Sequence, residues 1–252
     1  MSGERDTVVL PCAGAGSRLG LPIAKELVPV GAGRVALDHA LDLLAPHAHR
    51  LRLVAVLGEG REATARHLTA RCAGLGLPLA FCSQDDGLAE STGAVLSTAA
   101  WWGAATAVLL PDQVLARPAP RAVGDLLDLV HAGHRAAFLT SAQSDPDRLA
   151  VDGCLRLETT ADHRLPAVAD FADKPGPEQA QAQRFNAVWF AYAFARGHGP
   201  AFLDVLHRVT LRRPLPDTGL APLLGAPALD VGEFTDLGTW PNLAATITGS
   251  TS

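Results

Sequence analysis

The sequence predicts a single α/β domain with a mixed, mostly parallel sheet flanked by helices. Short apolar runs rich in β-branched residues alternate with stretches of helical periodicity through the first 140 residues. Glycine, proline or an acidic residue closes most of these runs, as expected where a buried strand meets a turn. The chain has 252 residues, of which 48% are hydrophobic and 19% charged, so it is long enough to bury a substantial core.

The alternation of predicted strands and helices is clearest in the first half of the chain. The run at 7–12 predicts a first buried strand, and Leu37, Leu41 and Leu44 share one face of a helix that follows. Glycines close the next predicted helix. The predicted strands are 7–12, 50–58, 77–83 and 106–112, and the predicted helices are 36–47, 61–76 and 93–103.

The second half is less regular. Residues 145–185 are rich in Pro, Asp and Gln, and no repeat or low-complexity linker separates them from the first half. We therefore expect one domain over residues 1–252, with parts at about 1–140 and 141–252. The predicted strands here are 135–142, 154–160, 166–172 and 185–194, and the predicted helices are 122–133 and 200–211.

Composition restricts the partners and the compartment. A net charge of −5 argues against broad binding of nucleic acid or of an anionic membrane. The four cysteines form no CxxC pair, which fits buried thiols in a reducing compartment. Polar residues follow the first methionine, and no apolar stretch has the length of a membrane span. We expect a soluble cytoplasmic protein, with Trp101 and Trp102 as a possible contact of a homo-oligomer.

The glycine turn after the first strand, "CAGAGSRLG", fits neither of two common phosphate-binding motifs. Leu19 stands where a dinucleotide fingerprint needs its third glycine, and the chain has no Gly-Lys-Ser/Thr triplet of a triphosphate loop. A tight turn alone accounts for Gly14 and Gly16. It does not account for Arg18 and Lys25, two cations that suit phosphate oxygens beside a nest of backbone amides.

This segment resembles the signature loop of the sugar-1-phosphate nucleotidylyltransferases, A-G-x-G-[ST]-R-[LM] followed by a spacer and [PS]-K-x-[LM]-x-P. The spacer from Arg18 to Lys25 is shorter than in glucose-1-phosphate thymidylyltransferases and closer to that of acetylglucosamine-phosphate uridylyltransferases. The resemblance implies a Rossmann-like (GT-A-type) nucleotidyltransferase domain in which Arg18 and Lys25 are catalytic. Pro11 and Ala24 depart from the usual pattern. The loop residues that it assigns to nucleotide binding are Ala13, Gly14, Ala15, Gly16 and Ser17.

The segment "SQDDGLAES", residues 83–91, resembles the part of that family that reads the base. By the resemblance, Gln84, Gly87 and Leu88 bind the nucleotide. A glutamine amide carries a donor and an acceptor, which match the imide edge of uracil or thymine. An ordinary turn is the alternative reading of "DDG".

Two acids fall in motifs that resemble the metal-binding segments of the family. Asp112 ends the strand 106–112, although Pro111 replaces a usual glycine, and Asp236 lies in "FTDLGTWPNL". By the resemblance both hold Mg²⁺, a hard cation that prefers carboxylate and phosphate oxygens. Carboxylates at strand ends also cap helices, which is the structural alternative.

The second half resembles the sugar-phosphate side of the family. "DFADKPGP" places Asp173 on a sugar hydroxyl and Lys174 on the sugar phosphate, where Lys174 is also catalytic. Asp173 is one methylene shorter than the usual Glu. Asn186 and Gly153 are expected in the sugar pocket, and Val188 replaces a usual glycine, which reshapes it.

The predicted function is nucleotidyl transfer from a nucleoside triphosphate, dTTP or UTP, to a sugar 1-phosphate, with Mg²⁺ as cofactor. A cytidylyl-, guanylyl- or adenylyltransferase acting on another sugar or cyclitol phosphate is the nearest alternative. A non-catalytic nucleotide-sugar-binding protein is a second one. A glycosyltransferase of related fold is disfavoured because the strand end "LLPDQVL" lacks an Asp-x-Asp motif.

Overall fold

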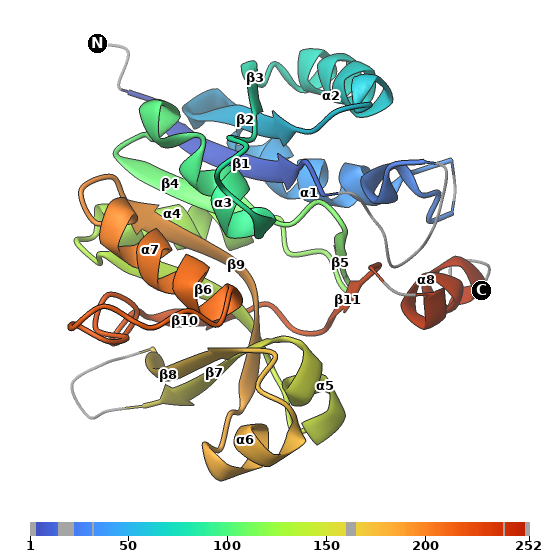
Figure 1. The fold of residues 1–252 in the computed structure, drawn as a ribbon. Helices are drawn as coiled ribbons and strands as arrows, with labels where there is room; N and C mark the ends of the chain where they lie inside the picture. Colours follow the sequence, from blue (N-terminus) through green and yellow to red (C-terminus); the bar gives the residue numbers. More distant parts are fainter. Residues whose placement is uncertain (1–3, 15–22, 32, 160–164, 239, 250–252) are drawn as a thin grey trace.

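The computed structural model describes residues 4–14, 23–31, 33–159, 165–238 and 240–249, and excludes the side chains of 245 and 247–249. Its core is a nine-stranded sheet, with a separate two-stranded pair at one edge (Figure 1). The strands are β1 (Asp6–Cys12), β2 (Leu51–Leu57), β3 (Leu79–Ser83), β4 (Ala105–Leu109), β5 (Gln113–Leu115), β6 (Ala136–Ala142), β7 (Gly153–Glu158), β8 (Ala167–Asp173), β9 (Ala187–Ala195), β10 (Ala228–Asp230) and β11 (Phe234–Asp236).

The central strand order is β10-β6-β9-β4-β1-β2-β3. Strands β1, β2, β3 and β4 pair in parallel, and so do β6 and β10. Strand β9 is antiparallel to both of its neighbours, β4 and β6. The sheet is therefore mixed and mostly parallel, as predicted, with the carboxyl ends of β1, β2 and β4 at one edge.

Helices cover both faces of this sheet (Figure 1). The helices are α1 (Ala36–Leu44), α2 (Glu62–Leu75), α3 (Glu90–Leu96), α4 (Ala122–His131), α5 (Pro146–Val151), α6 (Pro177–Ala182), α7 (Gly199–Thr210) and α8 (Trp240–Gly249), with 3₁₀ turns η1 (Lys25–Leu27), η2 (Ala45–Arg50) and η3 (Ala99–Trp101). None of the described helices is long and apolar enough to cross a membrane.

The period-2 alternation of β1 divides the core between the two faces. Val8, Leu10 and Cys12 belong to the apolar cluster under α1, α2 and α4. Val9, between them, belongs to the cluster under α3 and α7. All four side chains are almost fully buried, so β1 is fixed from both sides and its carboxyl end is a rigid support.

The long strand β9 joins a second layer to the sheet. Beyond the end of β4 it pairs with β7, which pairs with β8 in turn. Helices α5 and α6 lie below this β7–β8 pair (Figure 1). The Pro- and Asp-rich segment therefore builds a lobe on the main sheet.

The three-residue strands β5 and β11 pair antiparallel, with Asp236 opposite Gln113. Neither was expected from the sequence, nor were β10, α5, α6 and α8. The predicted helix 93–103 is shifted and split, since α3 covers Glu90–Leu96 and η3 follows it. The tail of the chain thus returns to the end of β4, and this return builds the candidate site.

Candidate active site

A cavity of about 570 Å³ opens where the carboxyl ends of β1 and β4 face the β7–β8 lobe. It collects side chains from both halves of the chain. Of the residues predicted from the sequence, it is lined by Ala13, Gly14, Lys25, Gln84, Asp112, Gly153, Asp173, Lys174 and Asp236.

The other predicted residues are placed differently. Ala15, Gly16, Ser17 and Arg18 lie outside the described residues. Leu88 lines a second hollow of about 480 Å³, which shares Ala13 and Gln84 with the cavity. Gly87 lies in the same loop, where its amide donates to Asp85 Oδ1 at 2.9 Å.

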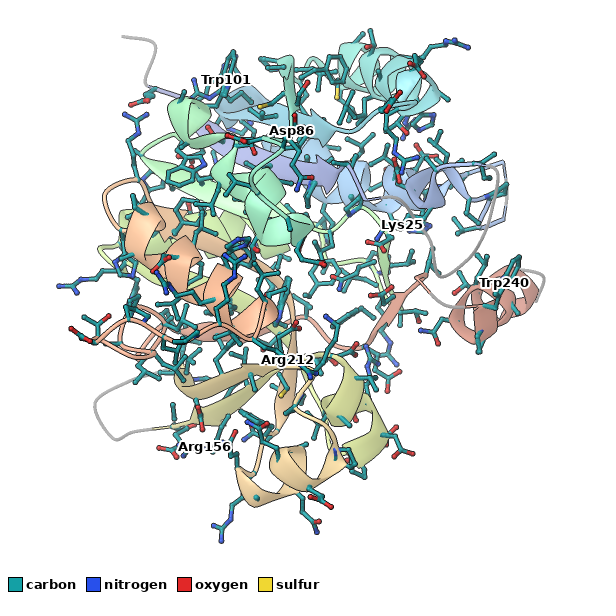
Figure 2. The ribbon with its side chains drawn as sticks, in the orientation of Figure 1. Lys25, Asp86, Trp101, Arg156, Arg212 and Trp240 are labelled. Carbon is teal, nitrogen blue, oxygen red and sulfur yellow. The ribbon has the colours of Figure 1, made fainter. Side chains whose placement is uncertain are left out.

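Lys25 and Asp112 form a short ion pair, with Lys25 Nζ 2.5 Å from Asp112 Oδ2. The Asp112 side chain is 4% exposed, whereas that of Lys25 is 27% exposed and reaches the cavity. Burial lowers the pKa of Lys25, but the charge and hydrogen bond of Asp112 outweigh it, so the pKa lies above its usual value. The ammonium stays charged. Figure 2 shows Lys25 beside the β5–β11 pair.

Asp236 reaches the same place from the other end of the chain. The β5–β11 pairing and the hydrogen bond from Leu237 N to Asp112 O, 2.9 Å long, bring the two acids together. Burial and then the charge of Asp112 raise the pKa of Asp236 to about 6. Two carboxylates and one ammonium leave the cluster with a net negative charge, which a cation ligand would offset.

Gly238 keeps the space between the two acids open. A Cβ at this position would lie 2.7 Å from Asp236 Oδ1 and 3.9 Å from Asp112 Oδ2. In the described part of the chain no group of three or more His, Cys, Asp or Glu side chains is placed to hold a metal ion. Two carboxylates beside an open space suit a cation such as Mg²⁺, which takes its remaining ligands from water and phosphate.

Gln84 stands at the opening between the cavity and the second hollow. Its Nε2 donates to Leu88 O at 2.7 Å and to Glu90 O at 3.2 Å. These bonds fix the loop and the orientation of the amide. Oε1 accepts no bond from the described residues, so it is the atom that a ligand can use.

Lys174 marks the opposite end of the cavity. Its Nζ lies 3.0 Å from Asp173 Oδ2, and its backbone amide donates to Asp152 O at 3.0 Å. Asp152 also lines the cavity and was not predicted from the sequence. Burial raises the pKa of Asp152, although Arg148 pairs with it at 3.3 Å. The only visible signal was an Asp-Gly turn before β7.

Asn186, expected in the sugar pocket, lies outside the cavity lining. Its Oδ1 accepts from Leu157 N at 2.8 Å and its Nδ2 donates to Leu157 O at 3.0 Å. The side chain thus acts as a ladder partner of β7. Val188 is also absent from the lining and is fully buried in the core.

Trp189 lines the cavity from β9 in their place. A Cβ on Gly153 would lie 2.0 Å from Trp189 Nε1, so the indole requires glycine there. Gly153 therefore shapes the Lys174 end of the cavity through the ring that packs over it.

Arg61 is a supporting residue that the sequence did not reveal. Its Nε donates to Cys12 O at 3.2 Å and its Nη2 donates to Gly14 O. The same guanidinium lies 3.9 Å from Glu26 Oε1, and Glu26 is 1% exposed. Arg61 thus ties the start of the glycine loop to the turn that carries Lys25.

The printed sequence does hold one signal for the site. Lys25 and Lys174 are its two lysines, against 19 arginines among 21 basic residues, and both line the cavity. Lysine offers a compact point charge, whereas arginine offers a rigid fork. The chain uses lysine rather than arginine only at these two positions of the cavity lining.

Comparison with known proteins supports the fold. No protein family model matches the chain, and no curated protein sequence matches it. A UDP-glucose pyrophosphorylase complexed with UDP-glucose superposes with a TM-score of 0.73 at 15% identity, covering 98% of each chain. A putative glucose-1-phosphate thymidylyltransferase from Bacillus anthracis gives 0.72 at 18%, covering 98% of this chain and 95% of that one.

The UTP-bound UGPase from Acinetobacter baumannii gives a TM-score of 0.71 at 17% identity and covers 97% of this chain and 93% of that one. The predicted resemblance to sugar-1-phosphate nucleotidylyltransferases is therefore confirmed for the fold. At these identities the likeness establishes architecture, and the chemistry must be argued from the site.

Replacing Arg61 tests its link to buried Glu26. Arg61→Ala removes the charge facing the Glu26 carboxylate, so we expect the free energy of unfolding to fall by roughly 2–4 kcal/mol. Adding Glu26→Gln should recover part of this loss, because a neutral amide then replaces the buried carboxylate. Urea unfolding of the four proteins of the cycle measures the coupling. Arg66→Ala, on the exposed face of α2, is the matched control; strict additivity would contradict the link.

The raised pKa of Asp236 predicts a pH dependence in metal-free protein. The unfolded chain loses this proton near the ordinary aspartate pKa of 3.8, whereas in the folded chain the pKa is about 6. The stabilisation is therefore complete below pH 4 and is lost as the pH rises through 6, on the order of 2 kcal/mol. Urea unfolding with chelator from pH 4 to 7 should show this decline in the wild type and not in Asp236→Asn. Parallel curves for the two proteins would contradict it.

Proposed function

We propose that this chain is a nucleotidyltransferase that moves the nucleotidyl group of a nucleoside triphosphate, UTP or dTTP, onto a sugar 1-phosphate. A phosphate oxygen of the acceptor attacks the α-phosphorus. The bond from that phosphorus to the bridging oxygen of the β-phosphate breaks, and pyrophosphate leaves with the electron pair. The products are a nucleoside diphosphate sugar and pyrophosphate.

One observation carries the proposal. Lys25, Asp112 and Asp236 meet at one point of a cavity that has Gln84 on one side and Lys174 on the other. In this proposal the nucleotide base lies at Gln84, the reacting phosphate lies at the Lys25 cluster, and the acceptor phosphate lies at Lys174. Two structural neighbours, a UDP-glucose pyrophosphorylase complexed with UDP-glucose and a UTP-bound UGPase, agree with that reading.

The attacking phosphate is already ionised, so the reaction needs no general base. The chain has to align two anions and neutralise the charge that builds between them. Lys25, whose pKa is raised, supplies one positive charge at the reacting phosphate, and Lys174 supplies another at the acceptor. Arg18 and the amides of residues 13–17 are proposed to hold the leaving pyrophosphate.

Asp112 and Asp236 would hold Mg²⁺, which when bound neutralises phosphate oxygens and orients the triphosphate. The open space beside Gly238 agrees with this role. Asp112 also holds the Lys25 ammonium in place through its ion pair.

The free acceptor atom of Gln84 supports a pyrimidine with a ring N–H. Because Nε2 is occupied by Leu88 O and Glu90 O, Oε1 is left to accept a hydrogen bond from a ligand. The N3–H of uracil or thymine meets this need, whereas N3 of cytosine is itself an acceptor. Guanine also carries a ring N–H and is the nearest competitor.

A substrate panel tests the proposed activity. The protein is incubated with each of the five common triphosphates, Mg²⁺ and a series of sugar 1-phosphates while pyrophosphate release is measured. We expect release with UTP or dTTP and at least one acceptor. Release with CTP, GTP or ATP alone would move the assignment to another base, and no release with any combination would overturn the enzyme proposal.

Variants of the central cluster test which residues carry the reaction. Lys25→Ala and Asp112→Asn should each lower kcat by about a hundredfold or more, because charge stabilisation of the transition state is lost. Circular dichroism should show the fold retained. Asp128→Asn removes a carboxylate of an exposed ion pair on α4 and should leave kcat unchanged. Near-wild-type turnover in either cluster variant would remove that residue from the mechanism.

A further inference from the structure

A groove of about 470 Å³ runs on from the acceptor end of the cavity. Phe171, Asp173 and Lys174 line both spaces, so the two adjoin along β8. One wall of the groove comes from β8 and α6, and the other comes from the end of α7 and the segment after it. A ligand seated at Lys174 therefore has room to extend.

The wall that follows α7 carries two arginines, Arg212 and Arg213. Figure 2 shows Arg212 between the end of α7 and the β7–β8 pair. Within the described residues neither guanidinium forms an ion pair or a side-chain hydrogen bond, whereas Arg208, one turn earlier, pairs with Asp204 at 2.9 Å. Asp170 is the remaining acid of the groove, since Asp173 is held by Lys174. The groove is net positive in a chain of net charge −5.

The backbone at Arg212 fixes where this side chain lies. Arg213 N donates to Arg208 O at 2.8 Å and Arg212 N donates to Val209 O at 3.1 Å, the two bonds of a Schellman ending. Arg212 takes the left-handed position of that ending, with φ +52°. Arg184 takes the same position at the end of α6, with φ +55°, and lines none of the described cavities. The conformation alone therefore does not indicate a ligand, and what distinguishes Arg212 is its place on the groove wall beside Arg213.

Cations near the carboxyl end of a helix also stabilise its free carbonyls, and this is the structural explanation to weigh. Arg208 on the last turn pairs with Asp204, and its Nη1 donates to Pro214 O at 3.0 Å, beyond the helix. The helix-end effect does not require two guanidinium groups along one groove. A bound anion accounts for this placement.

We propose that this groove binds a second anionic group on the acceptor, so that the substrate is a sugar phosphate with an acidic substituent away from its reacting phosphate. The inference rests on the proposed function and names its acceptor class. Arg212 and Arg213 offer forked donors that pair with a carboxylate or a second phosphate. A neutral sugar would leave both without a partner.

The test compares acceptors that differ in this group alone: glucose 1-phosphate, glucuronate 1-phosphate and glucose 1,6-bisphosphate. Arg212→Gln/Arg213→Gln removes both charges. Arg66→Gln/Arg135→Gln removes two exposed charges that line none of the described cavities and is the matched control. Pyrophosphate release gives kcat/KM for each acceptor, and calorimetry gives acceptor binding without any turnover.

We expect the wild type to favour an acidic acceptor by about tenfold or more, the size of one charged hydrogen-bond pair. The groove variant should lose this preference and keep its activity with glucose 1-phosphate, and the control should keep both. The acid that is favoured identifies carboxylate or phosphate as the recognised group.

Equal use of all three acceptors, or an equal loss with all three in the groove variant, would overturn the inference and leave nucleotidyl transfer intact. Absence of pyrophosphate with every acceptor would instead overturn the proposed function. In that case calorimetry still decides the groove, since tighter binding of the acidic acceptors must disappear in the groove variant and not in the control.

Discussion

The buried ion pair between Lys25 and Asp112 is the interaction on which the site depends. Two carboxylates lie together in a largely buried place, and burial of like charges is unfavourable unless a cation accompanies them. Lys25 supplies that cation from a short 3₁₀ turn near the amino end, and Asp236 arrives from the last part of the chain. The pairing of β5 with β11 therefore joins the last part of the chain to the end of β4 and brings Asp236 to Asp112 and Lys25.

This closure needs a rigid base and a supported loop. The base is β1, buried on both faces, and the support is Arg61, which holds carbonyls of Cys12 and Gly14 while facing Glu26. Burial and the nearby carboxylates of Glu26 and Asp112 raise the pKa of the Cys12 thiol well above its usual range. That cysteine is a protonated, packed side chain, as the dispersed cysteines suggested. The support of the glycine loop thus comes from Arg61, at the start of another element, α2.

The sequence predicted the long buried strands well. The segments of β1, β2, β4 and β9 are short, mainly apolar runs, a pattern that is typical of a strand buried on both faces. It did not reveal β5 and β11, whose pairing is made by contacts distant in the chain rather than by a local pattern. Motif resemblance pointed to four charged residues that all line one cavity in the structure: Lys25, Asp112, Lys174 and Asp236. It also pointed to Asn186, which lies outside this cavity because its side-chain amide bonds to the backbone of β7. Such a bond between a side chain and a strand leaves no pattern in the neighbouring sequence. Arg61 and Asp152 were missed for a related reason: their roles are set by partners on other elements.

The arginine usage of this chain has a practical consequence. Because its two lysines both lie on the cavity wall, an amine-reactive dye can attach to side chains of this protein only there, apart from the terminal amine. Lys25 is charge-paired and less exposed than Lys174, and its ammonium also gives up its proton less readily. The two lysines should therefore differ in reactivity, so that a dye attaches to the native protein preferentially at Lys174 and at the terminal amine, without any engineered cysteine.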